Sequence, residues 1–293
     1  MKAATPEVLI VGAGPAGVAA AIQLKRYGLA SVLLERDSVG GLLRNANLVE
    51  NYPGFPNGIP GPKLAALFER QLKQVGVEVI FDELTRLEYE SGWRAETRQT
   101  VYRPRVVVIA SGTKPRSLPV EVPEAVRTRV FSDVWPLAGV TGARVVIIGA
   151  GDAAFDYALN LADRGNAVTI LHRGKTDSCL PLLRERAASN PSIEYREQTS
   201  LQRVGIDSSS GRLALFTDCC SLFADYLLFA IGREPALDFV STSVKQQEQE
   251  LTASGKLYCA GDVHNGIFRQ AAIAVGEGLR VAMQIYTNRG WSR

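Results

Sequence analysis

The chain has 293 residues, 46% of them hydrophobic and 22% charged, and its net charge is only +3. This balance is typical of a globular protein long enough for two domains, and it excludes a disordered chain. The small net charge argues against binding to nucleic acid or to an acidic membrane surface, and no apolar stretch reaches the roughly 18 residues of a membrane span. Four cysteines without metal-ligand spacing favour a reducing, cytoplasmic location.

Residues 8–35 predict a strand, a glycine-rich turn, a helix and a second strand. Gly12, Gly14 and Gly17 have the GxGxxG spacing, which permits a tight turn, the approach of a diphosphate to backbone amides, and close helix packing. Glu35 ends the second strand, in the place where dinucleotide sites carry an acid that accepts hydrogen bonds from a ribose. The segment therefore predicts a dinucleotide site. The alternative is a glycine-rich turn without a ligand.

The stretch that follows predicts a long loop and then alternating elements. The loop, residues 37–64, is rich in glycine, proline and asparagine, and loops of this length within a domain are usually functional or disordered. The pattern then predicts a helix over 63–75, a strand over 77–81, an antiparallel meander over 85–102 and a buried strand over 105–110. Three prolines within residues 114–123 indicate a crossing into another domain.

The opening pattern returns at residues 145–171, where a strand, a GxGxxA turn, a helix and a second strand follow one another. His172 stands at the position that Glu35 has in the first copy, with Arg173 beside it and Lys175 just beyond. Loss of the acid and gain of cations is the pattern that binds a 2′-phosphate, so the second copy favours NADP over NAD. The alternative is a basic, solvated loop.

The remaining chain predicts further elements of both domains. Residues 180–189 read as a helix and residues 193–195, 213–217, 226–230 and 257–260 as strands, with a closing helix from about 268 to 286. The polar, glutamine-rich residues 241–250 are interpreted as the return crossing. Asp262, directly after Gly261, is placed either to bind a ribityl or ribose hydroxyl or to stabilise a turn.

Eight separated motifs resemble those of the low-molecular-weight thioredoxin reductases and their flavoprotein relatives, in the same order. They are GAGPAG with Glu35, GGL, ENYPGFP, ASG, GAGDAA with HR, AIGREP, AGDV and FRQAA. The resemblance implies an α/β fold with two Rossmann-like, doubly wound, three-layer nucleotide-binding domains, the second inserted in the first. It implies a discontinuous FAD-binding domain over residues 1–113 and 243–293, and an NAD(P)H-binding domain over residues 116–240.

The resemblance also implies the cofactor-binding residues. FAD would be bound by Gly12, Gly14, Pro15, Ala16, Glu35, Arg36, Gly41, Leu42, Asn51, Ala110, Gly112, Gly261, Asp262, Arg269, Gln270 and Ala271. NADP(H) would be bound by Gly151, Asp152, Ala153, His172 and Arg173. Relatives are commonly homodimers, which implies a homodimer here.

Three departures from the family pattern bear on function. Thioredoxin reductases carry a CxxC disulfide shortly before the second glycine turn, and this chain has no cysteine there. The family's HRR is here His172-Arg173-Gly174, one cation fewer. In the region of the missing cysteines Trp135 either fills a gap in the core or covers the flavin, and Trp291 is the candidate for an aromatic near the flavin at the end of the chain.

The sequence thus predicts an FAD-dependent oxidoreductase that passes electrons from NADPH to an acceptor without an internal dithiol. The flavin supplies the chemistry, so no catalytic acid, base or nucleophile is expected from the protein. The acceptor stays open between ferredoxin, flavodoxin, a quinone, another small molecule and a disulfide. Two alternatives are a ferredoxin-linked flavoprotein reductase with a vestigial nicotinamide site, and a non-catalytic flavin-binding protein. Cys219-Cys220 is read as a pair of packing residues, with a replacement disulfide as the alternative.

Overall fold

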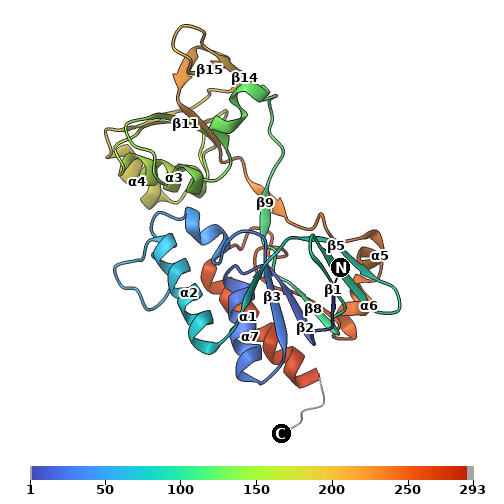
Figure 1. The fold of residues 1–293 in the computed structure, drawn as a ribbon. Coiled ribbons are helices and arrows are strands. Elements are labelled where there is room, and N and C mark those ends of the chain that lie inside the picture. The colour runs from blue at the N-terminus through green and yellow to red at the C-terminus, as the bar shows by residue number, and fades with distance from the viewer. Residues whose placement is uncertain (1, 289–293) are drawn as a thin grey trace. The chain divides into compact units, whose positions relative to one another are not determined.

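The structure is a computed structural model, and it describes residues 2–288. The chain divides into two compact units. Within the described residues, unit 1 comprises residues 2–44, 49–114 and 234–288, and unit 2 comprises residues 45–48 and 115–233. Unit 2 is therefore an insertion in unit 1, as the sequence predicts (Figure 1).

Unit 1 is built on a five-stranded parallel sheet with the order β19-β8-β2-β3-β4. Its strands are β2 (Val8–Val11), β3 (Ser31–Glu35), β4 (Val79–Phe81), β8 (Val106–Ile109) and β19 (Leu257–Cys259). All four residues of β2 are buried, as expected for a central parallel strand covered on both faces. The first residues of the glycine-rich turn follow directly at its carboxyl end, where ligands of doubly wound sheets bind.

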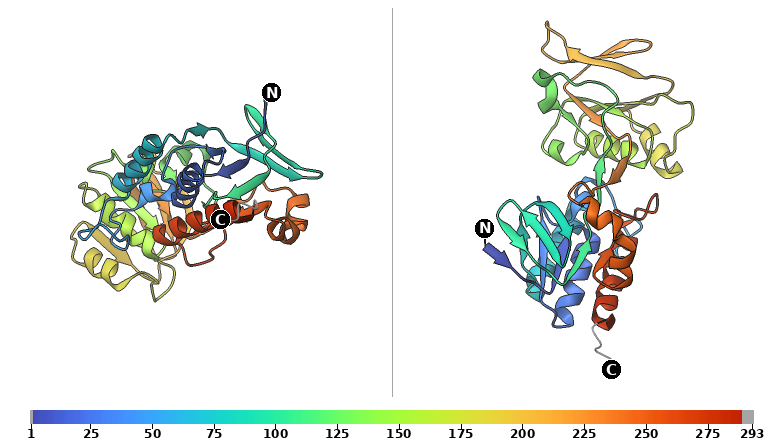
Figure 2. Two further views of the ribbon diagram at one scale, coloured as in Figure 1. Left: turned by 90° about the horizontal axis from the view of Figure 1, so that it is seen from below. Right: turned by 90° about the vertical axis from the view of Figure 1, so that its right-hand side faces the viewer.

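Helices cover one face of this sheet and a smaller sheet covers the other (Figure 2). The helices are α1 (Pro15–Arg26), α2 (Gly61–Val75) and α7 (Ala271–Asn288), and α1 contacts both of the others. The smaller sheet has the order β1-β7-β6-β5, with β1 (Lys2–Ala4), β5 (Leu84–Tyr89), β6 (Trp93–Thr97) and β7 (Thr100–Tyr102). Its Leu87, Trp93 and Tyr102 share one buried core with Leu9 and Val107 of the central sheet.

Unit 2 repeats this three-layer plan. Its parallel sheet has the order β10-β17-β11-β12-β13, formed by β10 (Val130–Phe131), β11 (Arg144–Ile148), β12 (Ala167–Leu171), β13 (Ile193–Arg196) and β17 (Tyr226–Phe229). Helices α3 (Asp152–Ala162) and α4 (Pro181–Ala188) share a core with one face. The antiparallel strands β14 (Leu201–Ile206), β15 (Leu213–Thr217) and β16 (Ser221–Ala224) share a core with the other. The described residues also contain three 3-10 helices, η1 (Gly41–Asn45), which begins in unit 1, and η2 (Glu124–Arg129) and η3 (Trp135–Leu137) in unit 2.

The return crossing differs from the sequence-based expectation in its position. The return from unit 2 to unit 1 falls between Arg233 and Glu234, in β18 (Arg233–Pro235), which pairs with β9 (Thr113–Pro115) of the outward crossing. The polar stretch after Ser241 instead forms α5 (Thr242–Gln246) and α6 (Glu248–Ala253), because each buries one apolar side chain in the core of unit 1, Val244 and Leu251.

The closing helix begins at Ala271 rather than at Phe268. The backbone of residues 265–269 turns tightly before it, with hydrogen bonds from Phe268 N to Asn265 O and from Arg269 N to Ile267 O. Among residues 2–288, no helix combines the length and the apolarity that crossing a membrane requires.

Candidate functional site

The glycine-rich turn of unit 1 places its glycines where side chains are impossible. Gly12 has a φ of +104°, and a Cβ there would lie 2.4 Å from the carbonyl oxygen of Ala110. A Cβ on Gly17 would lie 1.8 Å from the carbonyl oxygen of Gly12, so this glycine lets α1 pack against the turn. These two residues are structural glycines, because they are needed whether or not a ligand is present.

Gly14 differs from these two glycines, because it borders open space. It is the N-cap of α1 with an ordinary extended backbone, no side chain caps the helix, and no atom lies within 4 Å of a Cβ placed on it. Gly41, at the start of η1, stands opposite, and a Cβ there would lie 3.4 Å from the Cα of Gly14. The unsatisfied amides and the positive dipole end of α1 thus open between two residues without side chains, which is the geometry of an anion site.

Glu35 lies beside this helix terminus. Its carboxylate accepts hydrogen bonds from Ala13 N at 2.7 Å and from Asp37 N at 3.0 Å, which fixes the side chain. The same residue lines a cavity of about 330 Å³, within the size range of small-molecule sites. The cavity is lined by Val11, Gly12, Leu34, Glu35, Arg36, Asp82, Glu83, Leu84, Thr85, Ser111, Lys114, Ala236, Asp238 and Phe239.

Residues from the end of the chain complete the surroundings of the turn. The amide of Asn51 donates to Gln270 Oε1 at 2.8 Å, which joins two predicted FAD residues that are far apart in the sequence. A Cβ on Gly261 would lie 3.0 Å from the Cβ of Ala16 in the first turn of α1. Gly261 N donates to Glu277 Oε2 at 2.7 Å, and Glu277 of α7 therefore anchors the turn that carries Asp262.

The other predicted FAD residues are distributed over the same unit. Pro15 opens α1, Leu42 lies in η1, Ala110 is buried at the end of β8, Gly112 has a φ of +64°, Arg269 precedes α7, and Ala271 is its first residue. The sequence reasoning missed Glu277, which holds both Gly261 N and the side-chain amide of Asn265, at 2.8 Å. No local pattern marks it, because its contacts depend on how α7 packs beside α1.

The glycine turn of unit 2 resembles that of unit 1 in its first glycine, where the backbone leaves no room for a side chain. Gly149 has a φ of +137°, and a Cβ there would lie 2.3 Å from the carbonyl oxygen of Ala230. Gly151 is the N-cap of α3, again without a side-chain cap, and Ala153 in the first turn is exposed. The segment before α4 contacts this turn, because Leu180 N donates to the carboxylate of Asp152 at 2.7 Å. Ser178 N also donates to Ala150 O at 3.0 Å.

His172 and Arg173 follow the end of β12. The His172 ring lies 3.1 Å, through Nδ1, from the hydroxyl of Tyr195 on the neighbouring strand β13. Arg173 and Lys175 are both exposed, so their charges face solvent at this edge. The Tyr195 ring also carries the guanidinium of Arg184, whose carbon lies 4.1 Å from the ring centroid.

Arg184 is in turn paired with carboxylates, those of Asp177 and Glu197. Sequence reasoning missed both Tyr195 and Arg184. The available signal was that β13 runs parallel to β12, which places the last side chains of β13 beside His172.

Comparison with known proteins identifies the family. Residues 6–278 match the family model described as pyridine nucleotide-disulphide oxidoreductase. The chain belongs to this family.

The oxidoreductase is similar to thioredoxin reductases along most of its length. It is 29% identical to thioredoxin reductase of Streptomyces coelicolor, over 94% of this chain and 91% of the relative. It is 26% identical to a 34.2 kDa protein in the rubredoxin operon of Clostridium pasteurianum, over 94% of this chain and 95% of the relative. The crystal structure of Lactococcus lactis thioredoxin reductase superposes with a TM-score of 0.84 at 25% identity, over 97% of this chain and 98% of that one.

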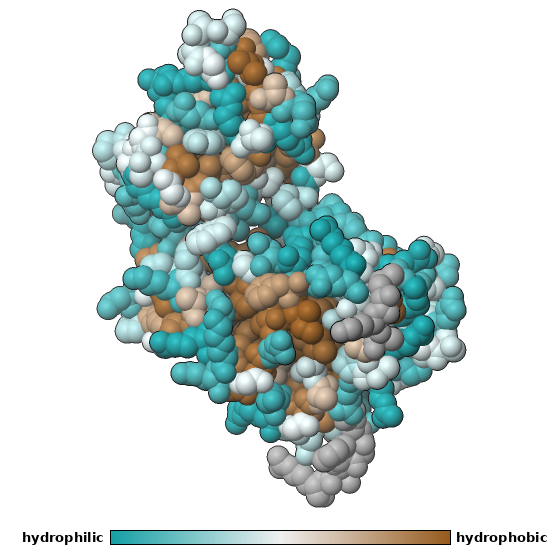
Figure 3. All heavy atoms as spheres, in the orientation of Figure 1, coloured by the Kyte–Doolittle hydropathy of each residue, from teal (hydrophilic) through white to brown (hydrophobic). Residues whose placement is uncertain are grey.

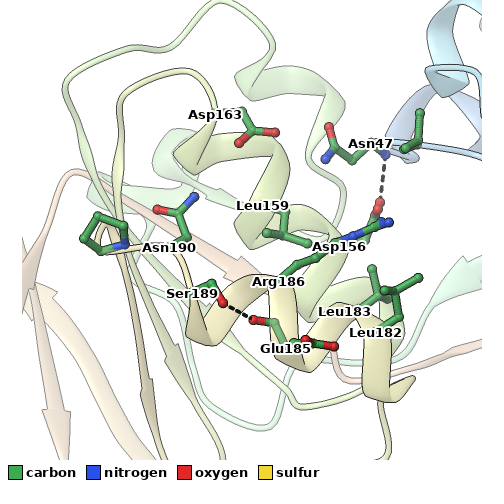
Figure 4. Close-up of a pocket in the computed structure, with 12 residues that line it drawn as sticks. Asn47, Asp156, Leu159, Asp163, Leu182, Leu183, Glu185, Arg186, Ser189 and Asn190 are labelled. Carbon is green, nitrogen blue, oxygen red and sulfur yellow. Dashed lines mark hydrogen bonds between the residues drawn. The ribbon is translucent and has the colours of Figure 1, made fainter. Parts of the chain in front are cut away.

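Unit 2 of the oxidoreductase has a second, larger cavity of about 680 Å³ between α3 and α4 (Figure 4). Its lining mixes carboxylates with leucines, and Asn47 N closes one side through a hydrogen bond of 2.8 Å to Asp156. The lining residues are Asn47, Leu48, Asp156, Leu159, Asp163, Leu182, Leu183, Glu185, Arg186, Ser189, Asn190 and Pro191. None of the predicted site residues is among them, so this cavity is separate from the glycine turn.

Two tryptophans, Trp135 and Trp291, are candidates from the sequence for contact with a flavin. Of the two alternatives for Trp135, filling a gap in the core is wrong, because the residue is 38% exposed at the start of η3. Its position is fixed through the backbone, since Trp135 N donates to Asn45 Oδ1 at 3.0 Å. Trp291 lies outside the described residues.

Proposed function

We propose that this oxidoreductase binds FAD in unit 1 and passes electrons from NADPH, bound in unit 2, to an external acceptor without an internal dithiol. The observation that carries the proposal is the amino end of α1, open between Gly14 and Gly41 and adjacent to the cavity around Glu35. An anion site next to a nucleoside-sized cavity with an acidic rim has the donor set that an adenine dinucleotide requires.

The residues of unit 1 fit FAD in three respects. A diphosphate would bind the amides at the start of α1, where Gly14 and Gly41 leave the space that a Cβ would fill. Glu35 would accept the hydrogen bonds of the adenosine ribose, with the nucleoside in the cavity of about 330 Å³. Asp262, held by the turn that Glu277 anchors, would bind a hydroxyl of the ribityl or ribose chain. Bound FAD supplies hydride acceptance from a nicotinamide and one- or two-electron transfer onward.

The residues at the glycine turn of unit 2 and after β12 are suited to binding NADPH. The amino end of α3 carries no side-chain cap, so its amides are available to the diphosphate of a dinucleotide. Arg173 and Lys175 present two exposed cations after β12, where Glu35 ends the matching strand of unit 1. A guanidinium and an ammonium group at this position attract a 2′-phosphate, and the absence of a carboxylate there removes the preferred partner of a free 2′-hydroxyl.

The acceptor is proposed to be external because the chain has no cysteine pair before the second glycine turn. Its four cysteines, at positions 179, 219, 220 and 259, are all free. A ferredoxin, a flavodoxin, a quinone or a disulfide of a partner protein would therefore take electrons directly from the reduced cofactor. The similarity to a protein encoded in a rubredoxin operon supports a small redox protein among these acceptors.

A homodimer in a reducing cytoplasm is part of the proposal. Helix α7 leaves three large apolar side chains exposed, those of Ile273, Leu279 and Met283. On another face of unit 1, Figure 3 shows apolar residues gathered over the strands around β3. A second copy would cover such a face. Sedimentation velocity of the holoprotein tests it, and a single monomeric species at micromolar concentration contradicts it.

A second candidate function has one observation in its favour. The segment around Ser178 is hydrogen-bonded to the glycine turn of unit 2 at Ala150 and Asp152, and one cation of the family's HRR motif is missing. Both features suit a reductase in which ferredoxin reduces the flavin and the nicotinamide site is vestigial. Such a protein would bind FAD tightly and would not be reduced by NADPH.

The proposal is tested first by identifying the cofactor and then by an acceptor panel. Protein purified without added flavin is denatured, and the released cofactor is identified by chromatography and mass. FAD is expected in about one copy per chain, and a chain that binds neither added FAD nor FMN contradicts the proposal. NADPH oxidation is then followed anaerobically with ferredoxin, flavodoxin, a quinone and a disulfide protein, each in turn. Turnover with at least one of them is expected.

A further inference from the structure

The turn between β15 and β16 brings two adjacent thiols to the surface of unit 2. Cys219 and Cys220 are both exposed, and their sulfur atoms lie 3.7 Å apart. The turn itself is closed by backbone hydrogen bonding, since Thr217 N donates to Cys220 O at 2.9 Å. The two sulfurs therefore share one side of a defined turn.

The side chain of Thr217 contacts both Cys219 and Cys220. Its Oγ1 accepts hydrogen bonds from Cys219 N at 3.3 Å and Cys220 N at 3.0 Å. It also lies 3.5 Å from each sulfur, and its one proton is donated to Cys220 O at 2.8 Å. On strand β13, Arg196 brings Nη1 to 3.7 Å from the Cys220 sulfur, while its Nε and Nη2 donate to the carboxylate of Glu194 at 2.8 and 2.9 Å. A hydroxyl and a guanidinium beside exposed sulfurs are the surroundings in which cysteines become nucleophilic.

The other two cysteines of the chain provide an internal contrast. Burial is the first cause that raises the pKa of the Cys179 and Cys259 thiols, in each case to about 11. The pKa of Cys219 is shifted the other way, because hydrogen bonds from Thr217 and from the neighbouring Cys220 stabilise its thiolate. Cys179 and Cys259 are thus rarely ionised at neutral pH, whereas Cys219 and Cys220 are both exposed to solvent.

We propose that Cys219 and Cys220 form a redox-active dithiol that exchanges with small disulfides and closes into a disulfide between adjacent residues. The Cys219 thiolate attacks one sulfur of a low-molecular-weight disulfide, forms a mixed disulfide and releases one thiolate. Cys220, after losing its proton to solvent, attacks the Cys219 sulfur and expels the second thiolate. Both cysteines are oxidised, and the small disulfide is reduced to two thiols.

The closed disulfide is expected to be easily reduced. The sulfurs must approach from 3.7 Å to about 2 Å, and the ring they close contains a single peptide bond. Strained, exposed disulfides have more oxidising potentials than structural ones, so the bond forms and opens in response to the thiol–disulfide balance of the solution.

The test uses the full-length holoprotein, fully reduced and then exposed to glutathione disulfide. Samples are quenched by alkylation and mapped by mass spectrometry. The expected product is a chain that has lost two hydrogens, with both Cys219 and Cys220 protected from alkylation. Cys179 and Cys259 should react at least about tenfold more slowly, because their smaller thiolate fraction outweighs their greater intrinsic nucleophilicity.

Single substitutions separate the two steps of the exchange. Cys220→Ser should stop at a stable glutathione adduct on Cys219, since no second thiol can expel it. Thr217→Val, which removes the hydroxyl and keeps the volume, should slow the first step several-fold. A persistent glutathione adduct on wild-type protein would overturn the proposal. So would equal reaction rates for all four cysteines.

An arsenical probe tests the geometry without any oxidation. Phenylarsine oxide needs two sulfurs on one arsenic atom, so wild-type protein should retain one equivalent through desalting, and Cys219→Ser and Cys220→Ser should retain none. Equal retention by the wild type and both variants contradicts the pairing. Neither readout depends on flavin reduction, so failure here leaves the proposed NADPH oxidation untouched, and the reverse also holds.

Discussion

Two glycines of one turn should respond in opposite ways to the same added methyl group. Gly12→Ala places a side chain on a residue with a φ of +104°, 2.4 Å from a backbone oxygen that cannot move without shifting β8. Gly14→Ala places the same group on a residue with a φ of −70°, with no atom within 4 Å. The pair therefore separates a glycine that the fold requires from one that the proposed ligand requires.

The expected magnitudes follow from these environments. A side chain at strained positive φ costs about 1–3 kcal/mol, and displacing the backbone adds to it, so Gly12→Ala should lower the free energy of unfolding by about 2–4 kcal/mol. Gly14→Ala should leave it unchanged or raise it by about 0.5 kcal/mol, because alanine restricts the unfolded chain. The methyl group on residue 14 instead occupies the space proposed for the diphosphate, and FAD affinity should fall at least about tenfold, or about 1.4 kcal/mol.

The assay has two parts. Urea unfolding of the flavin-free protein, followed by circular dichroism, gives the free energies, and fluorescence quenching on adding FAD gives the affinities. If Gly14→Ala destabilises the flavin-free protein as much as Gly12→Ala does, the space beside Gly14 is not open. If it folds normally and binds FAD with wild-type affinity, the diphosphate does not lie there.

Three further substitutions test the remaining contacts. Glu35→Gln should weaken FAD binding by about tenfold in equilibrium titration, because a charged acceptor is replaced by a neutral one; an unchanged affinity would remove it from the site. Arg173→Ala should reduce the preference for NADPH over NADH by about tenfold in kcat/KM, while Arg127→Ala, an exposed arginine of η2, should leave it unchanged; equal effects would point to general electrostatics. Glu277→Ala should lower FAD affinity several-fold by freeing the Gly261 amide, and normal binding would show that the turn holds without it.

The parts of the fold that the sequence predicts correctly are those that demand a particular residue type locally. Gly12 and Gly149 are recognisable because only glycine accepts a positive φ at a position where a Cβ would lie 2.4 Å or 2.3 Å from a backbone oxygen. The buried strands of both parallel sheets are recognisable for a similar reason, since both faces need apolar, β-branched residues.

The parts that escape prediction depend on contacts between distant segments. Residues 241–250 look like a polar crossing, yet single buried residues such as Val244 and Leu251 are enough to hold two short helices on unit 1. Glu277 and Tyr195 reach the candidate sites only through the packing of α7 beside α1 and of β13 beside β12. No spacing rule in one sequence encodes such neighbours.

The most direct test of the central claim is an anaerobic titration of the FAD-loaded protein with NADPH and, separately, with NADH. Absorbance of the oxidised flavin, near about 450 nm, is followed after each addition. The account predicts that about one equivalent of NADPH bleaches this band and that NADH does so more slowly. A flavin that stays oxidised with both nucleotides, while a chemically reduced ferredoxin bleaches it, would contradict the account and favour the ferredoxin-linked reductase.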